Sequence, residues 1–262
     1  MTSTPTSLLV IDVGTSGLRA GIVRDDGSLD SLHYRPFTPS TPFAGLVEFD
    51  AAEMARLVLE VSHAALAQGG PVGAVGITNQ RASTVVWDRR TGEPLGPALG
   101  WQDLRTVNEC IGARADHGLA LAPNVCIGTV DSWIVWTLTS GRHHVTDHSN
   151  AAVTGLCQFT DVATPHWHEF ACESLGIPIT MLPRIVSTSG IIAQADVLPG
   201  APLIAAIAGD QQASLIGQSC VRPNMTKCTF GTGANSRSTC TRYFIISRSS
   251  RTSTSSISTW RL

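Results

Sequence analysis

The sequence contains no run of 18 apolar residues, and no basic segment precedes the short apolar run near its start. The first absence argues against a membrane-spanning helix and the second against a signal peptide. No C-x-x-C pair and no zinc-like spacing occurs among its seven cysteines, which stand at positions 110, 126, 157, 172, 220, 228 and 240. We therefore expect reduced thiols, no membrane partner and a cytoplasmic location.

Charged residues are also few, at 15% of the 262 residues against 43% hydrophobic ones. This balance predicts a buried core rather than a disordered chain, in one large or two smaller domains. Residues 235–262 hold five Arg and no acid, so the remainder of the chain carries an excess of acid. An acidic body gives no reason to expect a nucleic-acid partner.

Residues 235–262 lack Gly, Pro, Ala, Asp and Glu, and 14 of these 28 residues are Ser or Thr. Such a composition predicts disorder. Two interpretations stay open. The segment is either an out-of-frame or prematurely terminated reading of a longer gene, or a genuine basic tail that docks on a partner.

Alternating apolar patterns and turn signals predict a mixed α/β sheet. A hairpin is expected at residues 7–24, and a helix after Asp50, with Glu53 three residues on. Further segments are strands at 72–80 and 83–88, a helix over 105–121, an apolar stretch of ambiguous type at 128–141, and a strand, turn and helix at 202–220.

The turn "DVGTSGLR" at residues 12–19 has the residue types of a phosphate-binding loop. Backbone N–H groups around Gly14, with the hydroxyls of Thr15 and Ser16, can cradle phosphate oxygens. Arg19 adds a cation, and Asp12 can hold Mg²⁺. The alternative is an ordinary glycine hairpin.

Three other stretches carry candidate chemistry. Asp210 and Gln211 follow an apolar strand, where a carboxylate can accept a hydroxyl proton; the alternative is a helix N-cap. Arg81 and Trp101 can grip a small polyol, or else be a surface Arg and a core Trp. A second Gly-Thr-Gly turn is formed by Gly231, Thr232 and Gly233.

The order of these motifs resembles the FGGY family of carbohydrate kinases. The motifs are D-x-G-T-S-x-x-R, "GITNQR", "GWQDLRT", "GTVDSW", "HVTDHSNA", "LGIPITMLP" and "AGDQQA" followed by G-T-G. The resemblance covers residues 7–234 and implies an actin-like, ribonuclease-H-like fold. It also implies transfer of a phosphoryl group from ATP, with Mg²⁺, to a sugar or polyol.

The resemblance implies a role for each candidate residue. Asp210 is the general base and, with Asp12, a metal ligand. The substrate contacts are Arg81, Trp101, Asp210 and Gln211. The phosphate contacts are Gly14, Thr15, Ser16, Arg19, Gly231, Thr232 and Gly233.

Three departures qualify the resemblance. Ala82 stands where relatives most similar to this chain carry an acid that binds the polyol. A segment found in relatives is missing near residues 124–125. The chain is about half the length of relatives, whose other half carries the adenosine pocket.

The resemblance and these departures predict the domain organisation and the activity. We expect an N-terminal kinase domain over 1–217, the start of a second domain over 218–234 and a tail over 235–262. We also expect weak or no kinase activity of the chain alone. A non-catalytic sugar- or nucleotide-binding protein and a sugar-independent ATPase of the same fold are the alternatives, and a homo-oligomer is possible.

Overall fold

The computed structural model describes most of the chain, in two compact units. The units are Met1–Asp210 and Gln211–Leu262, and each is described by itself. The described residues are 7–104, 124–159, 164–222, 224–230, 234–239 and 245–249. The predicted helix over 105–121 and the turn 231–233 lie outside them. The domain boundaries expected at 217 and 234 stay predictions.

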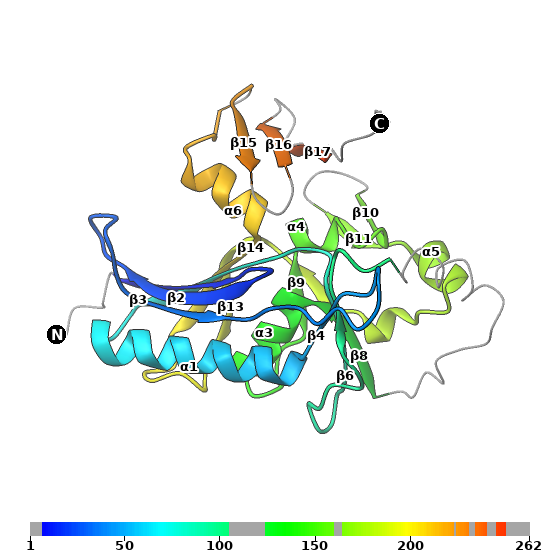
Figure 1. The fold of residues 1–262 in the computed structure, drawn as a ribbon, viewed down its shortest axis with the longest axis horizontal. Coiled ribbons are helices and arrows are strands. Elements are labelled where there is room, and N and C mark those ends of the chain that lie inside the picture. The colour runs from blue at the N-terminus through cyan, green and yellow to red at the C-terminus, as the bar shows by residue number, and fades with distance from the viewer. Residues whose placement is uncertain are drawn as a thin grey trace. The chain divides into compact units, whose positions relative to one another are not determined.

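A six-stranded mixed sheet forms the centre of the first unit (Figure 1). In spatial order its strands are β13 (Ser189–Gln194), β14 (Leu203–Gly209), β5 (Ala74–Asn79), β1 (Leu8–Val13), β2 (Gly17–Val23) and β3 (Leu29–Pro36). The inner strands β14, β5 and β1 run parallel, and β13, β2 and β3 pair antiparallel on either side. The mixed sheet and the hairpin predicted from the sequence are confirmed.

Helix α1 (Ala51–Gly69) packs its apolar face on this sheet. It begins after Asp50, whose carboxylate accepts a hydrogen bond from the Glu53 backbone N–H at 2.9 Å. It ends at Gly70, whose φ of 82° lies in the left-handed region that glycine tolerates. The predicted helix start is confirmed.

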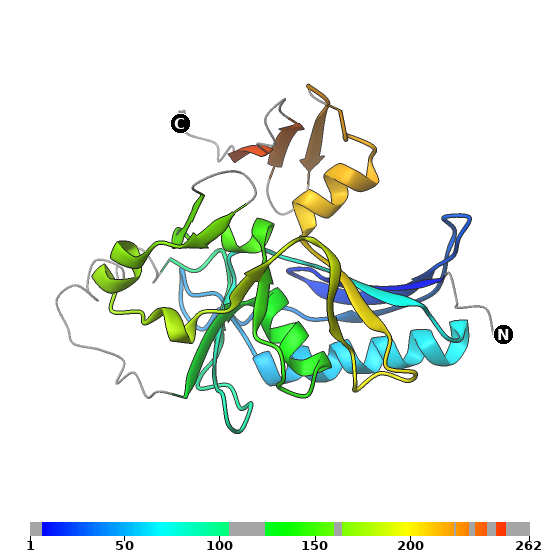
Figure 2. The ribbon, with the colours of Figure 1, turned by 180° about the vertical axis from the view of Figure 1, so that it is seen from behind.

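Helix α3 (Val130–Leu138) resolves the ambiguous stretch 128–141. Nearly every side chain of this helix is buried, so it lacks the polar face that marks an amphipathic helix in a sequence. The Trp133 indole donates to the Ala51 carbonyl at 2.8 Å and so joins α3 to the start of α1. Figures 1 and 2 show both helices on the same side of the central sheet.

A smaller sheet extends the core beside α3. Its strands, in spatial order, are β4 (Glu48–Phe49), β7 (Ala98–Leu99), β6 (Thr84–Asp88) and β8 (Val125–Thr129). The fully buried Trp87 ring of β6 meets the rings of Trp133, Trp136 and His144 edge-on, at centroid distances of 5.2, 5.7 and 5.0 Å. This aromatic cluster holds the small sheet against α3.

Short elements complete the first unit. They are β9 (Val145–Asp147) paired with β12 (Arg184–Val186), α4 (His148–Ala151), β10 (Cys157–Phe159) paired with β11 (Pro165–Trp167), α5 (Glu169–Ser174) and the 3-10 turn η1 (Ile179–Met181). Among the described residues, no helix combines the length and apolar character needed to cross a membrane.

Helix α6 (Asp210–Gly217) starts at the last residue of the first unit. The second unit continues with an antiparallel sheet of β15 (Thr226–Phe230), β16 (Ala234–Thr239) and β17 (Ile245–Ser249). The last two strands fall within the segment whose composition predicts disorder. The expectation of disorder for residues 235–262 stays a prediction.

Replacing Asp50 with Ala should destabilise the first unit by roughly 1 kcal/mol, because the first turn of α1 loses its side-chain cap. Urea unfolding followed by circular dichroism measures the loss. Asp50→Ser, which keeps a capping oxygen, should lose only a few tenths of this amount. An equal loss in both variants would show that the cap does not matter.

Candidate active site

The ends of the three parallel strands define the site. Pairing of β1 with β5 sets Val13 opposite Asn79, and pairing of β5 with β14 sets Asn79 opposite Gly209. The next residues along the chain, Gly14, Gln80 and Asp210, therefore leave the sheet at one edge. In open α/β sheets, ligands bind at this carboxyl edge.

The turn between β1 and β2 is tight and closely packed. The Gly14 N–H donates to the Gly17 carbonyl at 3.0 Å. A Cβ at Gly17 would lie 2.4 Å from the Tyr34 ring, so a larger residue at this position would displace that ring. Thr15 Oγ1 accepts a hydrogen bond from the Trp101 indole at 3.1 Å. The predicted phosphate turn thus touches a predicted substrate residue.

Asp12 and Arg19 lie opposite each other across the hairpin and form an ion pair at 2.6 Å. Burial raises the pKa of the Asp12 carboxyl; the Arg19 charge opposes this rise, and the Asp210 charge adds to it. Asp12 on β1 and Asp210 at the end of β14 lie on the two sides of β5, at the same edge of the sheet. Arg19 also stacks over the Tyr34 ring, 5.5 Å from its centroid.

The donor set at this edge suits Mg²⁺. Mg²⁺ takes oxygen ligands, and is commonly held by one or two carboxylates together with water and substrate phosphates. Asp12 and Asp210 supply two such carboxylates. Within the part of the chain that the structure describes, no group of three or more His, Cys, Asp or Glu side chains could form a metal cage. Two carboxylates, completed by water and phosphate oxygens, are a donor set that fits Mg²⁺.

Arg81 lies at the same edge of the sheet, two residues after the end of β5. Its Nε is 3.8 Å from Asp210 Oδ1, and its side chain is only 15% exposed, whereas that of Asp210 is 39% exposed. Burial lowers the pKa of the Arg81 guanidinium, against the opposing charges of Asp210 and Asp147. The buried Nε has no hydrogen-bond partner among the described residues. A buried donor facing a half-exposed carboxylate is a suitable site for a hydroxyl group.

Ala82 follows Arg81 with a φ of 65°, in the left-handed region that residues other than glycine seldom adopt. The loop after β5 is therefore bent sharply at the position where the sequence departs from the resemblance. Trp101, which is 39% exposed, reaches the site from the loop after β7. The structure thus brings Asp12, Thr15, Arg81, Trp101 and Asp210 together at one edge.

Some predicted site residues fall elsewhere. Gly231, Thr232 and Gly233 lie outside the described residues. Gln211 belongs to the second unit, where its Oε1 accepts from Lys227 Nζ at 3.5 Å. Their expected roles stay predictions.

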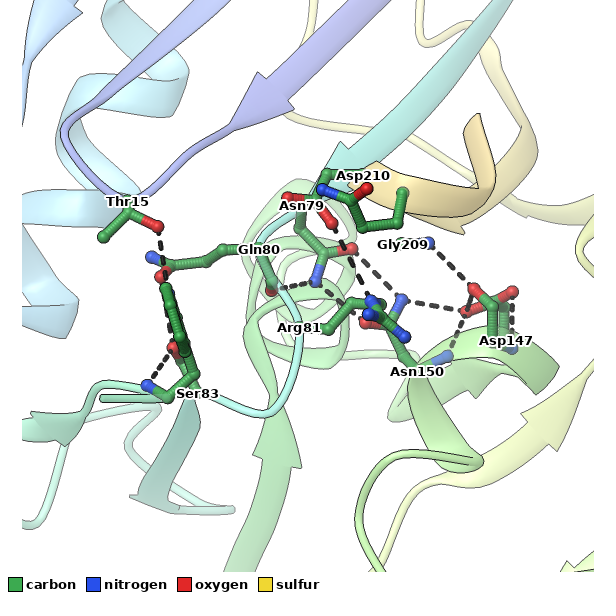
Figure 3. A network of polar contacts seen from close by, with 12 residues as sticks. Thr15, Asn79, Gln80, Arg81, Ser83, Asp147, Asn150, Gly209 and Asp210 are labelled. Atoms are coloured by element: carbon green, nitrogen blue, oxygen red, sulfur yellow. Dashed lines mark hydrogen bonds and ion pairs between the residues drawn. The ribbon is translucent and has the colours of Figure 1, made fainter. Parts of the chain in front are cut away.

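A buried polar network beneath the strand ends was not predicted from the sequence (Figure 3). The amides of Asn79 and Asn150 donate to each other at 3.0 and 3.1 Å. Asp147 accepts from the backbone and side chains of Ser149 and Asn150, while Ser149 Oγ accepts from the Gly209 N–H at 2.8 Å. This network ties α4 to the ends of β5 and β14. Its sequence signal was the stretch "TDHSN", in which Asp147 is a typical N-cap residue for the short helix that follows.

Asp131 lies at the base of this network and is fully buried. Its carboxyl accepts from the hydroxyls of Thr129 and Thr146 and from the Asp147 backbone N–H. Burial, followed by the charge of Asp147, raises the pKa of Asp131 from 3.8 to about 7. The folded protein therefore holds a carboxylic acid that stays protonated well above the pH at which the unfolded chain ionises.

Raising the pH from 4 to 7 should cost stability through Asp131. In this window the folded state binds a proton that the unfolded state has lost, so the free energy of unfolding falls as pH rises. The Asp131→Asn variant lacks this group. Its stability relative to the wild type should increase from pH 4 to 7 and level off above about 7. Urea unfolding at several pH values measures this difference; a difference that does not vary with pH would contradict the shift.

The sheet order and the ligand edge define an actin-like, ribonuclease-H-like domain. The profile of the N-terminal domain of the FGGY family of carbohydrate kinases matches residues 7–119 and 111–217. This chain therefore belongs to the FGGY family of carbohydrate kinases.

Individual relatives agree with this assignment. A glycerol kinase from Trichlorobacter lovleyi is 38% identical over 265 residues, covering 86% of this chain and 53% of that protein. A glycerol kinase from Gloeobacter violaceus is 37% identical over 259 residues, covering 87% of this chain and 52% of that protein. The chain spans about half the length of these curated relatives.

Solved structures show the same fold. The Plasmodium falciparum glycerol kinase with ADP matches with a TM-score of 0.78 at 24% identity, covering 89% of this chain and 54% of that one. A ligand-bound xylulose kinase from Lactobacillus acidophilus matches with a TM-score of 0.75 at 18% identity, again covering 89% and 54%. Kinases of glycerol and of a sugar therefore share this half of the fold.

Proposed function

We propose that this chain carries the acceptor-activating part of an ATP-dependent carbohydrate kinase of the glycerol-kinase type. The observation that carries the proposal is the alignment of Val13, Asn79 and Gly209, which brings the Gly14 turn and Asp210 to the same edge of the sheet, on the two sides of β5. Phosphoryl transfer requires a donor loop and a base on the acceptor within one site, and this geometry supplies both.

Asp210 is the proposed general base. It accepts the proton of the acceptor hydroxyl as the alcohol oxygen bonds to the terminal phosphorus of ATP and ADP leaves. The Arg81 guanidinium binds an oxygen of the acceptor and holds it beside Asp210, while the Trp101 ring packs against its carbon atoms. These contacts lower the barrier mainly by positioning.

The turn at Gly14, Thr15 and Ser16 binds phosphate oxygens through the N–H groups and the hydroxyls of Thr15 and Ser16, since the Gly14 N–H already donates within the turn. Mg²⁺, when bound with ATP, neutralises negative charge on the phosphates, and Asp12 and Asp210 are the residues that would hold it. The pairing of Asp12 with Arg19 supports this assignment, because Arg19 can pass from the carboxylate to a phosphate when the metal takes its place. Gln211 and the turn 231–233 are proposed as further contacts with substrate and phosphate, and a cytoplasmic location is proposed from the cysteine pattern.

Asp210→Asn tests the base. Titration calorimetry first measures binding of glycerol and of MgATP to the 262-residue chain, and a coupled assay measures ADP release. The variant should bind both ligands and lose about 10²- to 10⁴-fold in rate, the usual contribution of a general base. The control is Asp196→Asn, a carboxylate paired with Arg142 away from the strand ends.

Three other results are decisive. An unchanged rate in Asp210→Asn removes Asp210 as the base. Polyol binding without ADP release favours a non-catalytic binding protein. ADP release that does not depend on any polyol or sugar favours an ATPase.

Ala82→Glu tests the acceptor side. If glycerol is the substrate, an acid beside Arg81 should restore a hydrogen-bond acceptor worth about 1–3 kcal/mol, or about a five- to 150-fold gain in affinity. Ala82→Gln is the control of matched size, and it should gain less because it carries no charge. Both replacements keep a side chain at the positive φ, so the backbone cost cancels. Unchanged glycerol affinity in Ala82→Glu would indicate an acceptor other than glycerol.

A further inference from the structure

A closed ring of hydrogen bonds joins the proposed phosphate turn to Trp101, the proposed contact with the acceptor. Beyond the bond from the Trp101 indole to Thr15 Oγ1, the Trp101 backbone N–H donates to Ser83 Oγ at 3.0 Å. Ser83 Oγ donates to Gln80 Oε1 at 3.2 Å, and Gln80 Nε2 donates to the Gly14 carbonyl at 3.3 Å. The ring thus returns to the residue next to Thr15, and Figure 3 shows Thr15, Gln80 and Ser83 along this path.

Some members of the ring are buried in the core, and others lie at the site. Ser83 is 0% and Gln80 is 1% exposed, and these two side chains hold the backbone of Trp101 and of Gly14 in place. Trp101 is the exposed member of the ring. The buried Ser83 hydroxyl holds its backbone N–H, and Thr15 Oγ1 holds its indole N–H.

The direction of the Trp101 bond decides what Thr15 can do. An indole N–H only donates, so the Thr15 oxygen must be the acceptor, and the hydroxyl hydrogen must point away from Trp101. A hydroxyl that accepts one hydrogen bond is polarised and donates a stronger one. The indole therefore both turns the Thr15 hydroxyl toward an incoming acceptor and strengthens it as a donor.

We propose that Trp101 is a positioning residue for phosphate binding: its indole N–H orients the Thr15 hydroxyl toward a phosphate oxygen of ATP. This inference rests on the proposed function. It gives Trp101 a second role besides packing on the acceptor, and it couples the two ligands, because an acceptor that fixes the Trp101 ring also fixes the phosphate donor. Such coupling is reciprocal.

A double-mutant cycle on the full 262-residue chain tests the proposal. Equilibrium dialysis with labelled ATP in excess Mg²⁺ measures affinity for the wild type, Thr15→Val, Trp101→Phe and the double variant. Each single variant should bind MgATP about fivefold more weakly, the usual effect of one hydrogen bond. The double variant should be no weaker than Thr15→Val alone, since the indole acts only through the hydroxyl.

Two controls separate positioning from general damage. Thr15→Ser keeps the hydroxyl and should recover most of the MgATP affinity that Thr15→Val loses. Trp167→Phe also removes one indole hydrogen bond, to the Pro183 carbonyl at 2.8 Å, but in β11; it should leave MgATP affinity unchanged.

If Trp101→Phe does not fold, the pair Thr15→Val and Thr15→Ser still tests the bond through the ¹⁹F resonance of 5-fluorotryptophan at position 101. That resonance should move on MgATP addition in the wild type and in Thr15→Ser, and not in Thr15→Val.

The outcomes distinguish this inference from the function on which it rests. MgATP affinity that is unchanged in Trp101→Phe, losses that simply add in the double variant, or a ¹⁹F resonance that responds to MgATP equally in Thr15→Val would overturn the positioning role and leave the kinase proposal standing. A wild-type chain that binds no MgATP would overturn the positioning role, and one that binds neither MgATP nor glycerol would overturn both.

Discussion

The register of three parallel strands is the constraint on which the site depends. Because Val13, Asn79 and Gly209 are paired in line, the next residue of each strand leaves the sheet at the same level. A slip of one residue would turn the side chains of a strand to the opposite face. Asp12 would then leave the site, and Gly14 and Asp210 would no longer stand at matching ends.

Apolar packing alone holds such a register weakly, since aliphatic side chains of similar size can exchange places. The polar network beneath the strand ends is more selective, because a buried amide or carboxylate that loses its partner costs free energy. The reciprocal pair of Asn79 and Asn150 and the bond from Gly209 to Ser149 fit in only one register. The network therefore fixes the register of the strands that end beside Asp210, because any other register would leave buried polar groups without partners.

Local signals in the sequence were sufficient for the elements that local chemistry determines. The cap at Asp50 and the glycine turn between β1 and β2 depend on neighbouring residues, and they could be predicted. The pairing of Asn79 with Asn150 could not, because 71 residues separate them and no local pattern joins them. Helix α3 was ambiguous because its burial on all sides removes the periodicity that distinguishes a helix from a strand. The roles of the site residues came from the family resemblance, and position by position they remain proposals.

The charges at the strand ends show how the site can hold a polyanion without a net positive surface. Asp12 is paired with Arg19, and Asp210 faces Arg81, so the edge is balanced in the absence of ligand. Under the proposed function, MgATP would replace the existing partners of these charged groups. Arg19 would pair with a phosphate, and Asp12 would hold the metal. Each charge keeps a partner throughout, which limits the desolvation cost of binding. The hydrogen bond from Trp101 to Thr15 involves no charged group. Under our proposal, an acceptor bound against Trp101 would therefore influence phosphate binding without changing this balance of charges.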